Sequence, residues 1–352
     1  MLVSIDLTGD MISYAILDGE SIEKEILRNT IGFRTAELFR IDGAIGGLMR
    51  VAKDMIELSE GEPITEAICV LPQYVGYADR ERVKKAAADC GLKIRRVITG
   101  SLAAAYGLFQ ISEPEKKTIL LSVIRSDYAE FQLYEVDGDV LRTMGSAMAQ
   151  YEKDPVKLDP EKLKKKLLSE LKAMYGELGL AFGEKKEEVY LTFDERSEYL
   201  KSLFAEILEP FRRYDPLFFE NDAVRGAFSH LLRINSIQNE NIRKCVTQDC
   251  CIEGISICSG GSGDLQQVFR RNTPIPAQSV VELPVTSDNV LNFYAGNYRN
   301  REYDEPIGSC RIPVAYRGQN VIVKITLNEE AIVEYVVLDA KRQIIYPRQI
   351  LK

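Results

Sequence analysis

The chain has 352 residues, of which 45% are hydrophobic and 28% are charged, and its formal net charge at pH 7 is −8. This length predicts two domains, and the acidic balance argues against general nucleic-acid binding, which uses basic surfaces. Asp6 and Asp10 interrupt the first apolar stretch, and no stretch reaches the roughly 20 apolar residues that span a bilayer. We therefore expect a soluble, cytoplasmic protein without a signal peptide or membrane anchor.

The first 110 residues alternate between predicted strands and predicted helices. An apolar strand over residues 2–5 ends at Asp6 and leads into the turn Thr8-Gly9-Asp10. Such alternation predicts an α/β fold built on parallel strands. The further elements predicted here are strands at 13–18, 67–71 and 94–98 and helices at 44–58, 79–90 and 101–109.

Residues 118–136 predict a β-hairpin, because an apolar strand is followed by a turn and by a strand of alternating polarity. The turn, residues 122–127, contains no glycine. An amphipathic helix is predicted over residues 160–180, since leucines and a methionine recur on one stripe. Two more helices are predicted at 195–214 and 222–233.

The pattern changes at Asn235. Residues 235–249 are polar and predict a linker, and the rest of the chain shows short strands separated by turns. The strands predicted here are 268–271, 280–285, 291–294, 308–312, 320–327 and 331–339. Regular spacing of this kind predicts an antiparallel β-sandwich of about a hundred residues. We therefore expect a domain over residues 1–234, the linker, and a second domain over residues 250–352.

Cysteine and histidine usage restricts the possible chemistry. The chain has seven cysteines, an odd number that fits reduced thiols in a cytosolic protein. Four of them lie close together but form no C-x-x-C pair, so we expect no metal site there; they are Cys245, Cys250, Cys251 and Cys258. The single histidine, His230, is expected to have a packing or surface role, which excludes a His-dependent catalytic triad.

Several of these segments resemble the DnaK-type heat-shock chaperones, members of the actin-like ATPase superfamily. They occur in the same order as in that family: residues 3–10, 67–108, 271–278, 287–289 and 296–313. The resemblance implies a reduced actin-like (ribonuclease-H-like), two-lobed nucleotide-binding fold. It also implies that the following β-sandwich is like a chaperone substrate-binding domain.

The resemblance also indicates where a nucleotide would bind. The corresponding positions are Asp6, Thr8, Gly9, Asp10, Arg125 and Asp127. Asp10 places a carboxylate near the expected phosphate, where like charges repel. Gly100 stands where the family has a metal-organising glutamate, and Ser122 stands for the second-loop aspartate. Residues 124–126 replace a glycine triplet, although backbone N–H groups approach phosphate closely only where side chains are absent.

Other parts of the family's nucleotide site are missing. No Gly-Gly-x-x-Arg segment follows residue 214, and the subdomain with the catalytic lysine is mostly deleted between residues 32 and 44. Phosphoryl transfer depends on such positioned charges, so we expect no ATP hydrolysis. We expect Ile124 and residues 217–219 to fill the cleft. Arg125 is interpreted as a solvated turn residue, with contact to an anion as the alternative.

The β-sandwich differs from the family's pattern as well. Residues at the positions of the peptide-binding loops are Ser259, Gly261, Leu283, Leu291 and Phe293. Its first loop is small and polar, and its second is shortened. The three apolar residues could either contact a peptide or pack in the core. No helical lid is expected after the last strand.

The main hypothesis is a degenerate chaperone-like protein, a pseudo-ATPase without a cofactor, that acts as a protein- or peptide-binding scaffold. The alternative is a divergent ATP-dependent chaperone that still binds nucleotide with Mg²⁺ and unfolded peptide. A third reading is a metal-dependent hydrolase in which Asp6, Asp10 and Asp127 hold a divalent cation.

Overall fold

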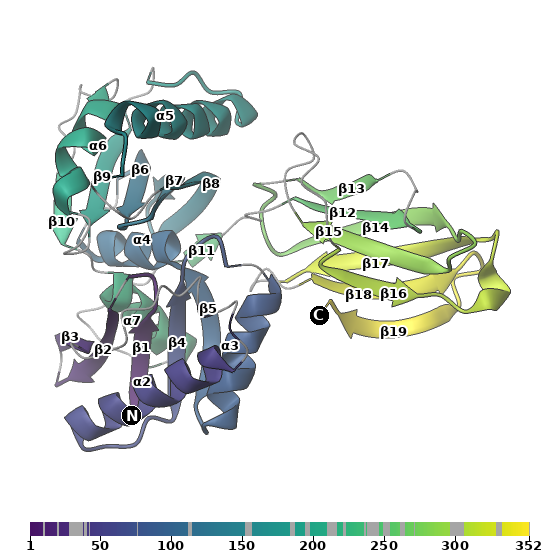
Figure 1. The fold of residues 1–352 in the computed structure, drawn as a ribbon, viewed down its shortest axis with the longest axis horizontal. Helices are drawn as coiled ribbons and strands as arrows, with labels where there is room; N and C mark the ends of the chain where they lie inside the picture. Colours follow the sequence, from purple (N-terminus) through teal and green to yellow (C-terminus); the bar gives the residue numbers. More distant parts are fainter. Residues whose placement is uncertain are drawn as a thin grey trace. The chain divides into compact units, whose positions relative to one another are not determined.

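The structure, a computed structural model, divides into two compact units, Met1–Thr247 and Gln248–Lys352 (Figure 1). It describes residues 1–9, 11–19, 21–27, 38, 41, 43–75, 77–111, 115–151, 157–183, 187–193, 198–209, 217–220, 223–235, 237, 246–248, 254–260, 265–270, 272–295, 306–328 and 333–351. The predicted domain boundaries stay a prediction. Within the predicted linker, Val246–Gln248 form a short strand, β11.

Unit 1 contains two mixed sheets with the same strand order. In the first sheet the order is β3-β2-β1-β4-β5, and in the second it is β8-β7-β6-β9-β10, with β11 beside β8. In each sheet the first strand pairs antiparallel with the second and parallel with the fourth. The predicted α/β character is therefore confirmed. The strands are β1 (Leu2–Asp6), β2 (Ile12–Asp18), β3 (Ser21–Leu27), β4 (Glu66–Leu71), β5 (Lys93–Thr99), β6 (Lys117–Ile124), β7 (Tyr128–Asp137), β8 (Val140–Gln150), β9 (Glu188–Phe193) and β10 (Leu217–Glu220).

Helices cover these sheets in three layers. The helices of unit 1 are α2 (Ala44–Glu60), α3 (Tyr77–Asp89), α4 (Gly100–Ile111), α5 (Pro160–Glu177), α6 (Lys201–Ile207) and α7 (Ala223–Ile234). Apolar residues of α2 and α3 share a core with one face of the first sheet. A second core joins α4 and α7 with both sheets, and α5 and α6 cover the remaining face of the second sheet.

Two features of these helices show how the sequence directs the fold. Helix α5 starts where Asp159 accepts hydrogen bonds from the N–H groups of Glu161 and Lys162, with Pro160 at the first position. Helices α4 and α7 cross closely at Gly226, where an added Cβ would lie 2.1 Å from the carbonyl oxygen of Ala103. The crossing distance therefore requires a glycine.

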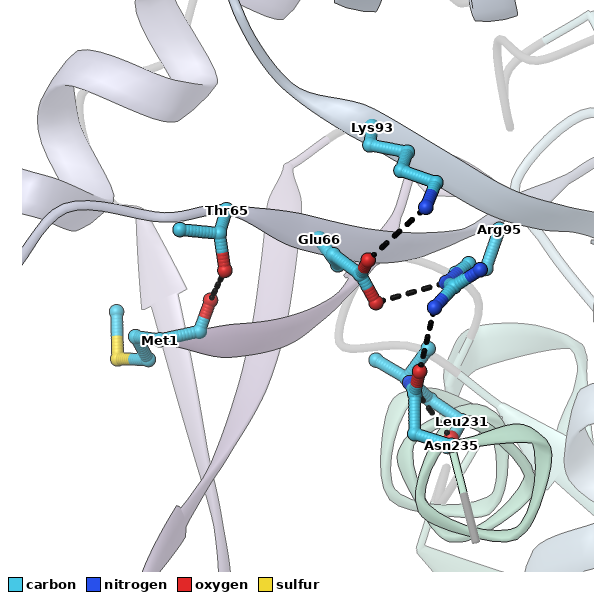
Figure 2. Close-up of polar contacts among 7 residues, drawn as sticks. All are labelled: Met1, Thr65, Glu66, Lys93, Arg95, Leu231 and Asn235. Atoms are coloured by element: carbon cyan, nitrogen blue, oxygen red, sulfur yellow. Dashed lines mark hydrogen bonds and ion pairs between the residues drawn. The ribbon is translucent and has the colours of Figure 1, made fainter.

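Ionic contacts connect β4 and β5 to the end of α7 (Figure 2). The Glu66 carboxylate accepts from Lys93 at 3.2 Å and from Nε of Arg95 at 2.7 Å. Arg95 also donates to the Asn235 side chain at 3.0 Å, and Asn235 donates to the Leu231 carbonyl. These contacts fix the position at which the chain leaves α7.

Unit 2 consists of two four-stranded antiparallel sheets, β13-β12-β15-β16 and β14-β17-β18-β19. The rings of Phe293 and Tyr335, one from each sheet, have centroids 4.8 Å apart. Strands β12 and β19 were not among the predicted ones. The strands are β12 (Ile255–Ser259), β13 (Gln266–Phe269), β14 (Ala277–Pro284), β15 (Val290–Ala295), β16 (Gly308–Arg311), β17 (Asn320–Leu327), β18 (Val333–Asp339) and β19 (Ile344–Ile350).

In the described part of the chain, no helix is long and apolar enough to cross a membrane. The helix predicted over 195–214 is observed as a 3₁₀ turn at Glu198–Leu200 followed by α6. Residues 210–216 lie outside the described residues.

Candidate functional site

The candidate site lies where the carboxyl ends of β1 and β4 meet the β6–β7 turn, the part of an α/β sheet at which ligands commonly bind. Asp6 ends β1 and is 3% exposed, and its carboxylate accepts a hydrogen bond from the Thr8 N–H at 2.8 Å. This contact shapes the turn that was predicted as a first phosphate loop. Gly9 lies in the same turn, whereas Asp10 is outside the described residues.

Arg125 is buried at this site and is only 1% exposed. Its Nε and one terminal nitrogen lie 3.2 and 3.1 Å from the Thr8 hydroxyl oxygen, and the other terminal nitrogen donates to the Ile124 carbonyl at 3.0 Å. The interpretation of Arg125 as a solvated turn residue is therefore wrong. Its side chain turns back toward the first sheet and bridges the two sheets, whereas a solvated side chain would leave the turn.

Two aromatic residues complete the contact around Arg125. The hydroxyl of Tyr128 donates to the Thr8 carbonyl at 3.1 Å, and the Tyr74 ring packs edge-on against the Tyr128 ring at 5.1 Å. Burial is the main reason that the pKa of Tyr128 is raised well above its usual value. Tyr128 therefore stays a neutral hydrogen-bond donor.

Glu130 makes a second connection between the sheets and is completely buried. Its carboxylate accepts from the Gln73 N–H at 2.6 Å, after β4, and from the Ser101 N–H at 2.9 Å, at the start of α4. A carboxylate is favoured at a helix N-terminus, where free N–H groups point outward. Burial raises the pKa of Glu130, and the hydrogen bonds from Gln73 and Ser101 and the charge of Arg125 oppose this rise.

We call Thr8, Gln73, Ser101, Arg125, Tyr128 and Glu130 the polar junction. Sequence reasoning found Thr8 and Arg125 but missed Glu130. The alternation of apolar and polar residues over 128–136 placed Glu130 on the polar face of its strand, which does not distinguish a solvated carboxylate from a buried one.

The polar junction uses positions that the resemblance assigns to the family's nucleotide and magnesium. An added Cβ at Gly100 would lie 3.1 Å from the Thr8 Cγ2 and 3.6 Å from the Glu130 carboxylate. A glutamate at this position, as the family has, would therefore require Thr8 to move. The Arg125 guanidinium already uses the Thr8 hydroxyl of the expected phosphate loop.

Ile124 does not fill this site, and that prediction is wrong. It is completely buried on the opposite face of the second sheet, in the core with Leu120, Phe131 and Leu167. Side chains alternate along a strand, which sends Ile124 and Leu120 to the same side. Residues 217–219 belong to β10, and their side chains lie outside the description.

The other predicted polar residues have varied surroundings. Asp127 lies half-buried in the β6–β7 turn, where its carbonyl accepts from the Tyr151 N–H at 2.7 Å. Among the residues that the structure describes, no three His, Cys, Asp or Glu side chains gather as metal ligands. Since Asp10 is not described, a cation held by Asp6, Asp10 and Asp127 stays a prediction.

His230 and the described cysteines lie apart from the site. His230 is 2% exposed, its ring stacks on Tyr106 at 4.3 Å, and its Nε2 lies 2.8 Å from the Arg96 guanidinium. Burial and the nearby Arg96 lower the pKa of His230 to about 2, so the ring is neutral and has a packing role. Cys69, Cys258 and Cys310 are buried free thiols, and Cys90 is half-buried; Cys245, Cys250 and Cys251 are not described.

The predicted peptide-binding residues lie mostly inside unit 2. Leu283, Leu291 and Phe293 are at most 2% exposed and pack in the core. Ser259 is also buried, and its hydroxyl accepts from the Thr286 N–H at 3.2 Å. Gly261 lies outside the described residues. Their contact with a peptide stays a prediction.

Comparison with known proteins fits this mixed α/β architecture. The family model described as Hsp70 protein matches residues 12–128. The chaperone protein DnaK of Burkholderia cenocepacia (strain HI2424) is 29% identical over 97 residues, 26% of this chain and 15% of that protein. The DnaK of Picrophilus torridus is 32% identical over 102 residues, 26% of this chain and 16% of that protein.

The chain thus carries an Hsp70-like region, and the resemblance to the DnaK-type chaperones is confirmed there. The matched part spans about one sixth of the length of these curated relatives. The family match over residues 12–128 includes Gln73, Ser101, Arg125 and Tyr128 of the polar junction. The activity and partners of this chain are therefore matters for proposal.

Proposed function

We propose that this chain is a degenerate Hsp70-like protein that does not hydrolyse ATP and that acts as a protein- or peptide-binding scaffold. In this proposal unit 1 is a reduced actin-like fold, and unit 2 is a β-sandwich related to chaperone substrate-binding domains. The repeated strand order of the two sheets in unit 1 supports the first part. The relatives named DnaK support a protein partner.

The observation that carries the proposal is the burial of Arg125 against Thr8. A triphosphate in the first loop needs free backbone N–H groups and close approach. Here the Thr8 N–H is bonded to Asp6, and the Thr8 hydroxyl and carbonyl are bonded to Arg125 and Tyr128. The protein's own side chains thus make the contacts between the two sheets that a bound nucleotide would otherwise make.

Isothermal titration of the full chain with ATP and with ADP, each with Mg²⁺, tests this proposal. We expect no heat of binding for the wild type and no phosphate release above background. Binding at micromolar strength together with hydrolysis would overturn the proposal and support the alternative, an ATP-dependent chaperone. The Arg125→Gly variant should be titrated in the same way, because it removes the side chain that contacts Thr8 in the predicted first phosphate loop.

A further inference from the structure

Exposed apolar side chains gather on one sheet of unit 2, β14-β17-β18-β19. Val280 on β14 is 63% exposed, and Ile344 and Ile350 on β19 are 67% and 47% exposed. Val280 is paired with Lys324, and Lys324 is paired with Val336 on β18. Directly paired residues lie on the same face of a sheet. The side chains of Val280, Lys324 and Val336 therefore form one row on the outer face.

A trough of about 470 Å³ follows this row. We call it the Val280 trough; its lining includes Gln278, Val280, Lys324, Thr326, Val336 and Arg348. Its volume falls within the range of about 300–1,000 Å³ that is common for ligand sites. The two valines make opposite apolar walls on either side of Lys324.

The two cationic residues at the trough, Lys324 and Arg348, differ in whether a neighbouring carboxylate neutralises their charge. Arg348 is neutralised, because its Nε and one terminal nitrogen each lie 2.6 Å from a carboxylate oxygen of Glu334. This contact lowers the pKa of Glu334, which is therefore ionised at neutral pH. Lys324 is exposed and has no hydrogen bond or ion pair with another described residue. Among the described residues, the Lys324 ammonium group thus lies without an ionic partner between the two aliphatic walls.

We propose that the Val280 trough binds an acidic peptide, with an aliphatic side chain between Val280 and Val336 and a carboxylate on Lys324. This inference rests on the proposed scaffold function and names the site and the chemistry of the partner. It differs from the site predicted from the sequence, because Leu283, Leu291 and Phe293 are buried whereas Val280 is accessible. The aliphatic contact supplies affinity, and Lys324, whose charge no described carboxylate neutralises, selects an acidic partner.

Fluorescence polarisation with the full chain tests the proposal. The probe is a fluorescein-labelled nonapeptide of alternating Val and Glu, and the comparison peptide has Lys in place of Glu. We expect the acidic peptide to bind and the peptide with Lys in place of Glu not to bind. Val280→Asp and Lys324→Glu should each weaken this binding about tenfold, because the first places a charge in an apolar contact and the second repels the carboxylate.

Matched variants in the same unit serve as controls. Val314→Asp changes a valine of almost equal exposure, 62%, and Lys341→Glu reverses an exposed lysine in the β18–β19 turn. Both should leave the affinity within about twofold. Circular dichroism melting of all four variants identifies any that fail to fold.

Two results would overturn the proposal. One is that the acidic peptide does not bind the wild type, or binds all four folded variants equally. The other is a wild-type dimer in analytical ultracentrifugation that Val280→Asp dissociates, because a second copy of the chain then covers the trough. Neither result bears on ATP binding. The titration with nucleotide therefore tests separately whether the chain is a degenerate Hsp70-like protein that does not hydrolyse ATP.

Discussion

Replacing Arg125 by methionine should strongly destabilise unit 1, because the change removes the guanidinium but keeps much of the side-chain volume. In the folded protein Arg125 donates to the Thr8 hydroxyl and to the Ile124 carbonyl, and its charge favours the ionised form of Glu130. The variant leaves both oxygens without this donor and leaves Glu130 without this nearby cation.

The size of the loss in the free energy of unfolding follows from the burial of Arg125. Arg125 is 1% exposed, so its hydrogen bonds are made away from water. Its charged hydrogen bonds to the Thr8 and Ile124 oxygens, at about 1.5–3 kcal/mol for each oxygen, give a loss of about 3–6 kcal/mol. This loss is a large part of the roughly 5–15 kcal/mol by which domains are stable.

Urea unfolding of the full chain, followed by circular dichroism, measures the effect. Arg142→Met is the matched control, because Arg142 lies in the same sheet, pairs with Glu135 and has a side chain that is 48% exposed. Its loss should cost about 0.2–1 kcal/mol. Hydrogen exchange adds a local measurement: the amides of Gln73 and Ser101, which donate to Glu130, should exchange faster in Arg125→Met. An equal loss of stability in both variants would refute the assigned role of Arg125.

Three further predictions concern the core of unit 1. Because burial raises the pKa of Glu130, the folded chain holds the proton of this carboxyl group more tightly than the unfolded chain does. The contribution of Glu130 to stability therefore declines as pH rises above about 4.5, the ordinary pKa of glutamate. Glu130→Gln should remove this decline, so its stability relative to the wild type should be higher at pH 7.5 than at pH 4.5 in urea titrations; a constant difference would contradict this. Gly226→Ala should destabilise unit 1 by about 3 kcal/mol or more, because its Cβ would meet the Ala103 carbonyl. Gly176→Ala is the control, since its Cβ would enter free space and the change should be neutral or stabilising. Similar melting temperatures for the two variants would be inconsistent with the close crossing of α4 and α7. His230 has a lowered pKa of about 2 against 6.5 when unfolded, so its contribution to stability is complete above pH 6.5 and is lost as pH falls toward 2. His230→Gln should show a weaker loss than the wild type between pH 6.5 and 4.5, and parallel curves would argue against a neutral buried ring.

Local patterns in the sequence were sufficient to predict many elements. The stripe of apolar residues predicts a helix over residues 160–180, and the structure places α5 at Pro160–Glu177. The helix predicted over 222–233 is observed at Ala223–Ile234. Both predictions succeed because the 3.6-residue period of apolar side chains is a local property. Strand β19 was missed because its residues 346–349 have no apolar alternation and include Pro347.

The sequence by itself thus determined the α/β pattern, the change at residue 235 and the loss of glycine from the β6–β7 turn. Only the tertiary structure decided where the side chains of that turn lie. Arg125 contacts a residue 117 positions earlier in the chain, and Glu130 contacts one that is 57 positions earlier. Local patterns cannot specify such pairs, because burial of a charge depends on which partners the packed sheets bring within hydrogen-bonding distance.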